Sequence, residues 1–88
     1  MKVEYRKKFL KELAKIPLPY RETIEIFVFE NLPNLKSLSE TKRIEKLTGY
    51  HGYFKIRFGV YRVGLKYADE IVTIERVLHR KEIYKYFP

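Results

Sequence analysis

The chain has 88 residues, and its 19 Lys and Arg against 11 Asp and Glu give a formal net charge of +8 at pH 7. This length fits one domain over residues 1–88, and the charge predicts binding to a polyanion, with nucleic acid first and an acidic protein or a membrane surface as alternatives. The chain has no cysteine, no apolar run near the roughly 20 residues that span a bilayer and no apolar secretion signal, so we expect no disulfide, no membrane anchor and a cytoplasmic location.

The first third of the chain is predicted to be helical after a short strand at residues 2–5. Apolar side chains recur at helical spacing along residues 9–16, and two prolines then stop that helix. A second helix, antiparallel to the first, is expected from Pro19 to about residue 32. Its apolar surface is broad and includes Ile26 and Phe29, so this helix either lies between the first helix and a sheet or docks a partner.

The rest of the chain is predicted to form mainly strands. The segments follow one another as loop 35–41, extended segment 42–47, turn 48–52, and strands 53–58 and 60–67. A second hairpin turn at residues 68–69 leads to a further strand, and residues 80–87 fit a short helix. These elements predict an α+β domain in which two antiparallel N-terminal helices pack on a small, mainly antiparallel sheet, with a short C-terminal helix.

Residues 53–62 alternate apolar and cationic side chains around a Gly-Val pair that is typical of a two-residue hairpin turn. With that turn, Arg57 lies directly opposite Arg62, and Lys55 shares their face of the sheet. Like charges in that relation destabilise a sheet, by roughly 0.2–1 kcal/mol. The arrangement therefore indicates a site for an anion, against the alternative of a merely solvated face.

After the last strand the chain carries further candidates for the same face, namely His79, Arg80, Lys81 and Tyr84. Arginine and lysine bind phosphate, and tyrosine offers a ring on which a base can stack. Each candidate has a structural alternative, because Arg62 can pair with Glu75 in the register that a turn at residues 68–69 gives, His79 can be structural, and Tyr84 can belong to the core. Only two histidines occur, and no carboxylate accompanies them at ligand-like spacing, so we expect no metal site and no cofactor.

Three runs of sequence, at residues 46–49, 53–63 and 77–84, together resemble the RelE branch of the RelE/ParE toxin superfamily. With the two N-terminal helices, the resemblance covers nearly the whole chain. It implies a RelE-like, microbial ribonuclease-like fold and the toxin of a type II toxin–antitoxin pair, which enters the ribosomal A site and cuts mRNA. It also implies a RelB-like antitoxin, acidic and helical, in a heterodimer or heterotetramer with the toxin.

The resemblance further implies metal-free and cofactor-free chemistry, in which the ribose 2′-hydroxyl attacks the adjacent phosphate and leaves a cyclic phosphate and a 5′-hydroxyl. The residues that match by motif are Lys55 for activating the 2′-hydroxyl, Arg62 for the phosphate, Arg80 for the leaving group and Tyr84 for stacking. Arg57 departs from the motif, which has a second lysine there, and an arginine binds phosphate but accepts a proton poorly. The general base is therefore Lys55 or His79, while Lys81 adds to RNA binding.

Two other functions compete with mRNA cleavage. ParE-like toxins of the same superfamily act by binding DNA gyrase, and a small basic domain can also bind RNA without cutting it. ParE-like chains generally lack the full set of cationic and tyrosine site residues. Because this chain supplies the whole set, the sequence favours the nuclease.

Overall fold

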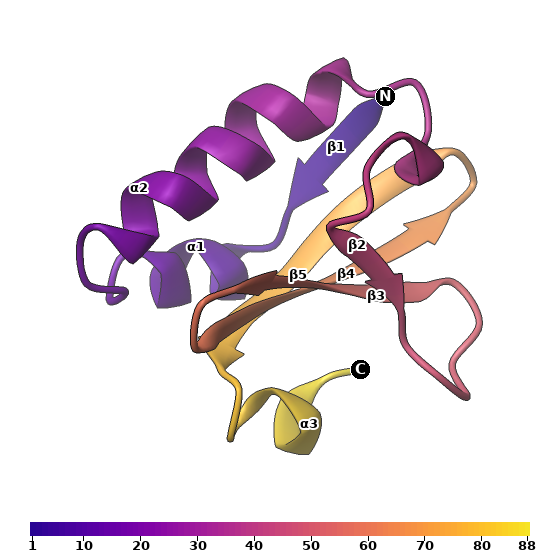
Figure 1. The fold of residues 1–88 in the computed structure, drawn as a ribbon. Helices are drawn as coiled ribbons and strands as arrows, with labels where there is room; N and C mark the ends of the chain where they lie inside the picture. The colour runs from indigo at the N-terminus through magenta and orange to yellow at the C-terminus, as the bar shows by residue number, and fades with distance from the viewer.

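Five strands form one sheet in the order β1-β5-β4-β3-β2 in the computed structural model, which describes residues 1–88 (Figure 1). The strands and helices are β1 (Lys2–Tyr5), α1 (Lys7–Leu13), α2 (Tyr20–Glu25), β2 (Ile44–Lys46), β3 (Tyr53–Phe58), β4 (Tyr61–Ala68), β5 (Ile71–His79) and α3 (Ile83–Tyr86). Only β1 and β5 pair in parallel. The predicted α+β class is confirmed, with two N-terminal helices on a mainly antiparallel sheet and a short C-terminal helix. None of the helices combines the length and the apolar character that crossing a membrane requires.

The second N-terminal helix changes its geometry along its length. It begins as α2, widens into a π-helix at Ile26–Asn31 and closes with a 3-10 turn at Leu32–Asn34. The side chains that it buries are Ile24, Phe27, Val28 and Leu32. These side chains pack against every second residue of the central strands. Every second residue of a strand points to the same face of the sheet. The main core therefore lies between the N-terminal helices and one face of the sheet.

Two polar contacts fasten the sheet to the helices that cover it. The Glu12 carboxylate of α1 accepts hydrogen bonds from Arg76 Nη2 at 2.6 Å and from the backbone N–H of Val77 at 3.1 Å. This hydrogen bond from Arg76 to Glu12 raises the pKa of the Arg76 guanidinium. The Tyr5 hydroxyl of β1 donates to the Val28 carbonyl oxygen at 2.6 Å, and burial raises the pKa of Tyr5.

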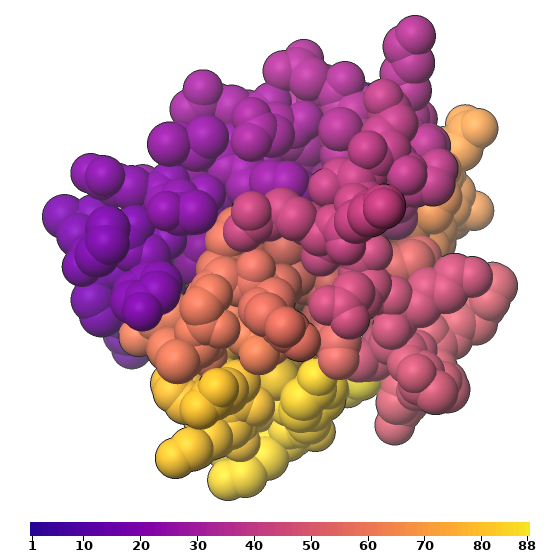
Figure 2. Space-filling view, in the orientation of Figure 1, coloured from indigo at the N-terminus to yellow at the C-terminus, as the bar shows by residue number.

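The C-terminal helix covers part of the opposite face of the sheet. Ile83 and Phe87 are buried there together with Leu47. Gly64 in β4 provides the space, since a Cβ at that position would lie 2.7 Å from the ring of Phe87. Figure 2 shows the C-terminal segment (yellow) against the β3–β4 hairpin (orange). Because α3 has only four residues, much of this face stays open for other side chains.

The turn between β4 and β5 differs from the predicted one. Its central residues are Asp69 and Glu70, both with positive φ, at 53° and 63°. Aspartate tolerates this left-handed conformation better than most residues, and two successive positive φ angles are typical of a hairpin turn. Leu65 consequently pairs with Ile74, whereas the predicted turn at residues 68–69 would place Leu65 opposite Val72.

A β-bulge in β5 moves the register again. It adds one residue to β5 between the pairs that Leu65 and Gly64 make, so that Gly64 lies opposite Arg76. Arg62 then lies opposite Leu78, and its expected pairing with Glu75 is wrong. The alternative in which a glutamate of the neighbouring strand neutralises Arg62 is removed by this register.

Candidate active site

The β3–β4 hairpin has the predicted register, with Arg57 opposite Arg62 and Lys55 opposite Gly64. Lys55, Arg57 and Arg62 therefore share the face on which α3 packs, because Phe87 of the C-terminal segment covers Gly64. Arg57 is exposed, whereas Lys55 and Arg62 are half-buried. The face thus carries the like-charged cross-strand pair that the sequence predicted, and an anion bound between the two guanidinium groups would relieve their repulsion.

The guanidinium of Arg62 is fixed at the end of the hairpin. Its Nη1 donates to the carbonyl oxygens of Gly59 at 2.7 Å and of Tyr61 at 3.0 Å. Burial lowers the pKa of Arg62, and the positive charges of Arg57 and Arg80 lower it further. Arginine nevertheless stays protonated at neutral pH. Since a guanidinium has five N–H donors, the three on Nε and Nη2 remain for a ligand.

The tail after β5 is tied to the same hairpin turn. The backbone N–H of Arg80 donates to the Val60 carbonyl oxygen at 2.7 Å. This bond brings the exposed Arg80 side chain close enough to Arg62 for their charges to interact. The next residue, Lys81, is also exposed, and its backbone N–H donates to His79 Nδ1 at 3.1 Å.

Lys55 and Tyr84 form the most direct contact of the site. Lys55 Nζ donates to the Tyr84 hydroxyl at 2.7 Å and lies 5.2 Å from the centroid of its ring. The two side chains line a hollow of about 270 Å³ together with Leu47, Thr48, Tyr50 and Phe87. Tyr84 is 57% exposed, so the alternative of a core tyrosine is wrong, and it is the preceding Ile83 that anchors α3.

His79 lies apart from this cluster. It pairs with Tyr61 in the β4–β5 ladder and therefore points to the face of the sheet that carries Tyr61. Its ring packs edge-on against the Tyr61 ring, with 6.0 Å between the centroids. The structure thus brings Lys55, Arg57, Arg62, Arg80 and Tyr84 together, and it places His79 across the sheet from them.

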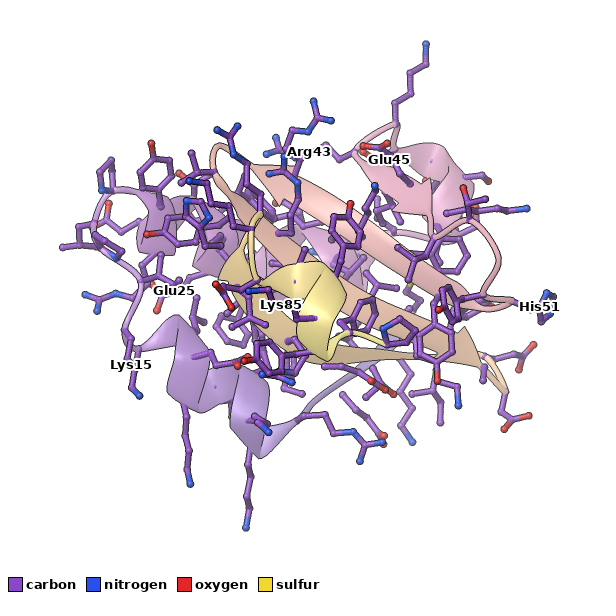
Figure 3. The ribbon with its side chains drawn as sticks, turned by 90° about the horizontal axis from the view of Figure 1, so that it is seen from below. Lys15, Glu25, Arg43, Glu45, His51 and Lys85 are labelled. Carbon is purple, nitrogen blue, oxygen red and sulfur yellow. The ribbon has the colours of Figure 1, made fainter.

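The site also contains a carboxylate that the sequence did not single out. Glu45 of β2 lies opposite Lys55 and raises the pKa of Arg62 by its negative charge. Figure 3 views the molecule from the α3 side and shows Glu45 beside Arg43 at the β2 edge. Arg43 stacks over the ring of Phe58 at 4.7 Å from its centroid. Only the β2–β3 register would have revealed Glu45. No cluster of three or more His, Asp or Glu side chains suited to a metal ion occurs.

The sequence of this chain is similar to those of known toxins. Residues 3–84 match the family model of the ParE toxin of the type II toxin–antitoxin system parDE. The chain is also 43% identical to Toxin RelE3 of Methanocaldococcus jannaschii, over the full length of both proteins. The chain belongs to the RelE/ParE toxin superfamily.

Solved structures of RelE proteins share the fold of this superfamily member. The RelB-RelE antitoxin-toxin complex from Methanococcus jannaschii matches at 39% identity with a TM-score of 0.81, covering 97% of this chain and 99% of the matched chain. The RelBE2 toxin-antitoxin complex from Mycobacterium tuberculosis matches at 28% identity with a TM-score of 0.67, covering 90% and 96% of the two chains. The family model carries the ParE name and these relatives carry the RelE name, so the chemistry of the site has to distinguish the two branches.

Proposed function

We propose that residues 1–88 act as one RelE-type toxin domain, which cuts mRNA in the ribosomal A site and thereby inhibits translation. The observation that carries the proposal is the contact between Lys55 and Tyr84 beside the Arg57–Arg62 pair and Arg80. A lysine, a phenol and three arginines close together on one face of the sheet suit a single scissile nucleotide, because the transition state of phosphate transesterification gains negative charge. A gyrase inhibitor that acts only by binding does not require this set.

The proposed reaction begins with the 2′-hydroxyl of the message. Lys55, in its neutral form, accepts the 2′-proton, and the 2′-oxygen attacks the adjacent phosphorus while the bond from phosphorus to the 5′-oxygen breaks. The free N–H groups of Arg62, with Arg57 opposite, hold the phosphate oxygens, and Arg80 stabilises the leaving 5′-oxygen, which takes up a proton from water. The products are a 2′,3′-cyclic phosphate and a 5′-hydroxyl.

Lys55 is preferred to His79 as the proton acceptor in this proposal. The Tyr84 hydroxyl contacts the lysine nitrogen at 2.7 Å and fixes its direction, whereas His79 sits with Tyr61 on the other side of the sheet. A general base must lie within hydrogen-bond reach of the proton that it removes. The mechanism assigns no step to a metal ion, since the positive charge that the phosphate needs comes from the chain's own arginines.

We also propose a RelB-like antitoxin as partner, in a heterodimer or heterotetramer, because the M. jannaschii and M. tuberculosis relatives were solved as toxin–antitoxin complexes. An acidic antitoxin segment suits the cationic face rather than the second helix. On the second helix, the exposed Ile26 and Phe29 border a hollow of about 300 Å³ whose other lining residues are Glu22, Glu25 and Glu30. These glutamates would repel an acidic segment.

The test is a defined translation reaction with purified toxin, in which primer extension locates breaks in the message. Arg62→Ala should lower the cleavage rate about 10²- to 10³-fold, the usual loss for one transition-state donor. Arg6→Ala is the matched control, because it removes an exposed arginine at the start of α1 and should leave the rate unchanged. Cleavage that requires ribosomes supports the proposal. An intact message together with trapped DNA–gyrase complexes would support the ParE-type alternative instead.

A further inference from the structure

The hollow beside Lys55 has a second exposed aromatic wall that the superfamily motifs do not include. Tyr84 of α3 forms one wall, and Tyr50, from the loop between β2 and β3, forms another. The two side chains are 57% and 55% exposed, while Leu47 and Phe87 beneath them are buried. The hollow therefore combines an apolar floor, two accessible rings and a lysine.

The backbone holds Tyr50 in place on both sides. Its N–H donates to the Leu47 carbonyl oxygen at 3.2 Å, and its own carbonyl oxygen accepts from the N–H of Tyr53 at 3.3 Å. Gly49 and Gly52 on either side take positive φ angles of 86° and 81°, which let the chain turn tightly around it. The ring is thus carried by a fixed turn, although it is not packed into the core.

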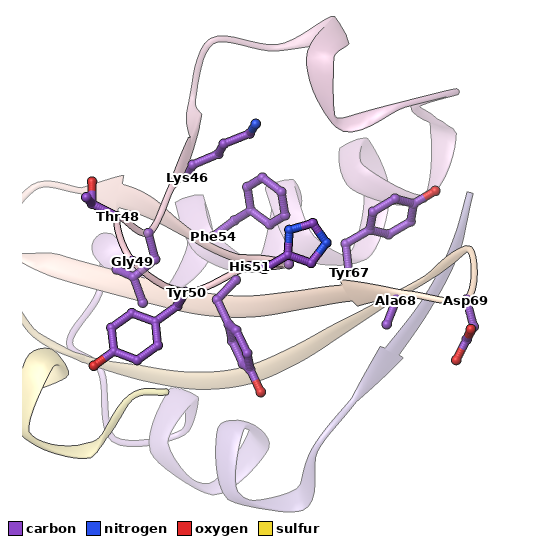
Figure 4. Close-up of a pocket in the computed structure, with 12 residues that line it drawn as sticks. Lys46, Thr48, Gly49, Tyr50, His51, Phe54, Tyr67, Ala68 and Asp69 are labelled. Atoms are coloured by element: carbon purple, nitrogen blue, oxygen red, sulfur yellow. The ribbon is translucent and has the colours of Figure 1, made fainter.

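Tyr50 is directed toward the face of the sheet on which α3 packs and which carries Lys55, Arg57 and Arg62. Figure 4 shows it pointing to the side of the C-terminal helix (yellow), whereas Lys46 of the same segment points the opposite way. Tyr50 also lines a larger hollow, of about 860 Å³, to which His51 of the same loop and Tyr67 of β4 contribute. Neither of those residues lines the hollow that holds Lys55 and Tyr84.

A slot of this composition fits a nucleobase. Proteins bind single-stranded RNA by stacking bases on exposed aromatic rings, and every base has a π-face that such a ring can meet. The hollow has a volume of about 270 Å³. Pockets for drug-sized ligands measure about 300–1,000 Å³, so this smaller hollow suits a smaller group such as a single base. The side chain of Lys55 lines the slot, where the ribose and phosphate of the same nucleotide would follow.

We propose that Tyr50 is a second stacking residue, which holds one base of the message next to the scissile phosphate while Tyr84 contacts its neighbour or its other face. This inference rests on the proposed nuclease function and names the substrate contact that the loop adds to it. The loop between β2 and β3 would then help to set which nucleotide is presented to Lys55.

A coupled substitution on protein and RNA tests the contact. Ribosomes are programmed with messages in which each nucleotide of the A-site codon is replaced in turn by an abasic ribonucleotide, which keeps the 2′-hydroxyl. Tyr50→Ala should lower kcat/KM about 5- to 150-fold, the range that loss of one base–aromatic stack gives, and Tyr50→Phe should not. At one nucleotide only, the losses of kcat/KM caused by the abasic message and by Tyr50→Ala should not add, because both changes remove the same stack. Tyr67→Ala, which alters a tyrosine outside the slot, is the control.

Normal cleavage by Tyr50→Ala would overturn the inference, and so would losses that add at every nucleotide of the codon. A toxin that does not cut on ribosomes would end the proposed function but not the slot, which has its own readout. A short 2′-O-methylated oligoribonucleotide, which cannot be cut by 2′-attack, is titrated into the toxin and tyrosine ring signals are followed by NMR, with Tyr50→Phe to assign them. Shifts at Tyr50 support the slot, and shifts that leave Tyr50 unmoved refute it.

Discussion

The close packing of Phe87 on Gly64 predicts that one added methyl group will disable the face of the sheet that carries Lys55 and the arginines. In Gly64→Ala, the new Cβ would lie 2.7 Å from two ring atoms of Phe87 and 2.8 Å from a third. Gly64 belongs to the central strand, which is hydrogen-bonded on both sides, so its backbone cannot move aside. The ring of Phe87 must leave its place instead.

The size of the effect follows from the burial of Phe87, which is only 3% exposed. Returning a phenylalanine side chain to water costs about 1.5–3 kcal/mol. Since each 1.4 kcal/mol is a factor of ten, the docked population of the C-terminal segment should fall by roughly 10- to 150-fold relative to the undocked one. Tyr84 would leave Lys55 together with that segment, and cleavage should drop by up to the same factor. The core on the other face of the sheet is not touched.

Two measurements check this prediction. Amide hydrogen exchange should show that residues 82–87 lose protection in Gly64→Ala, while β3, β4 and β5 keep theirs. Primer extension on programmed ribosomes should show the matching loss of cleavage. Phe87→Ala removes the ring without adding the methyl group and should give the same pair of results. Gly64→Ala with native protection of residues 82–87 and full activity would refute the argument that α3 positions Tyr84.

Three further predictions concern stability. Glu12→Gln should lower the free energy of unfolding in urea by about 1–3 kcal/mol, because it weakens the charge-assisted bonds from Arg76; an unchanged value would mean that water replaces the pair. Burial raises the pKa of Tyr5, so its stabilising effect is complete below its unfolded pKa of about 10 and is lost as pH rises through the higher folded value. Tyr5→Phe should lower the free energy of unfolding by about 1 kcal/mol at neutral pH and lessen the loss of stability at alkaline pH. Urea titrations from pH 8 to 11 check this, and an equal loss of stability in both proteins would contradict it. Arg57→Gln should raise the free energy of unfolding by roughly 0.2–1 kcal/mol while slowing cleavage. A less stable variant would show that Arg57 and Arg62 do not repel each other in the native protein.

The parts of the fold that depend on local rules were predicted correctly from the sequence. A two-residue turn fixes which residues face each other across a hairpin, so the Gly-Val pair was enough to place Arg57 opposite Arg62. The amphipathic spacing likewise identified both N-terminal helices. The predicted turn between β4 and β5 was wrong because Glu70 adopts a positive φ that its residue type does not suggest.

The position of His79 could not be predicted, because it depends on the bulge. Without the extra residue in β5, side chains would alternate from the buried Ile74 so that Glu75 and His79 face the side of Arg62. The bulge reverses that alternation and turns His79 toward Tyr61. The contact between Lys55 and Tyr84 was equally hidden, since it depends on where tertiary packing places α3 rather than on any spacing along the chain.

The opposed guanidinium groups of Arg57 and Arg62 also have a practical consequence for anyone handling the purified toxin. Arginine guanidinium groups bind small divalent oxyanions such as sulfate and inorganic phosphate, and any ligand that binds only the native state raises the melting temperature. Buffers with these salts should therefore preserve the protein during purification and storage. In the proposed reaction the same salts would compete with the message, so turnover measured in phosphate buffer would understate the rate in chloride.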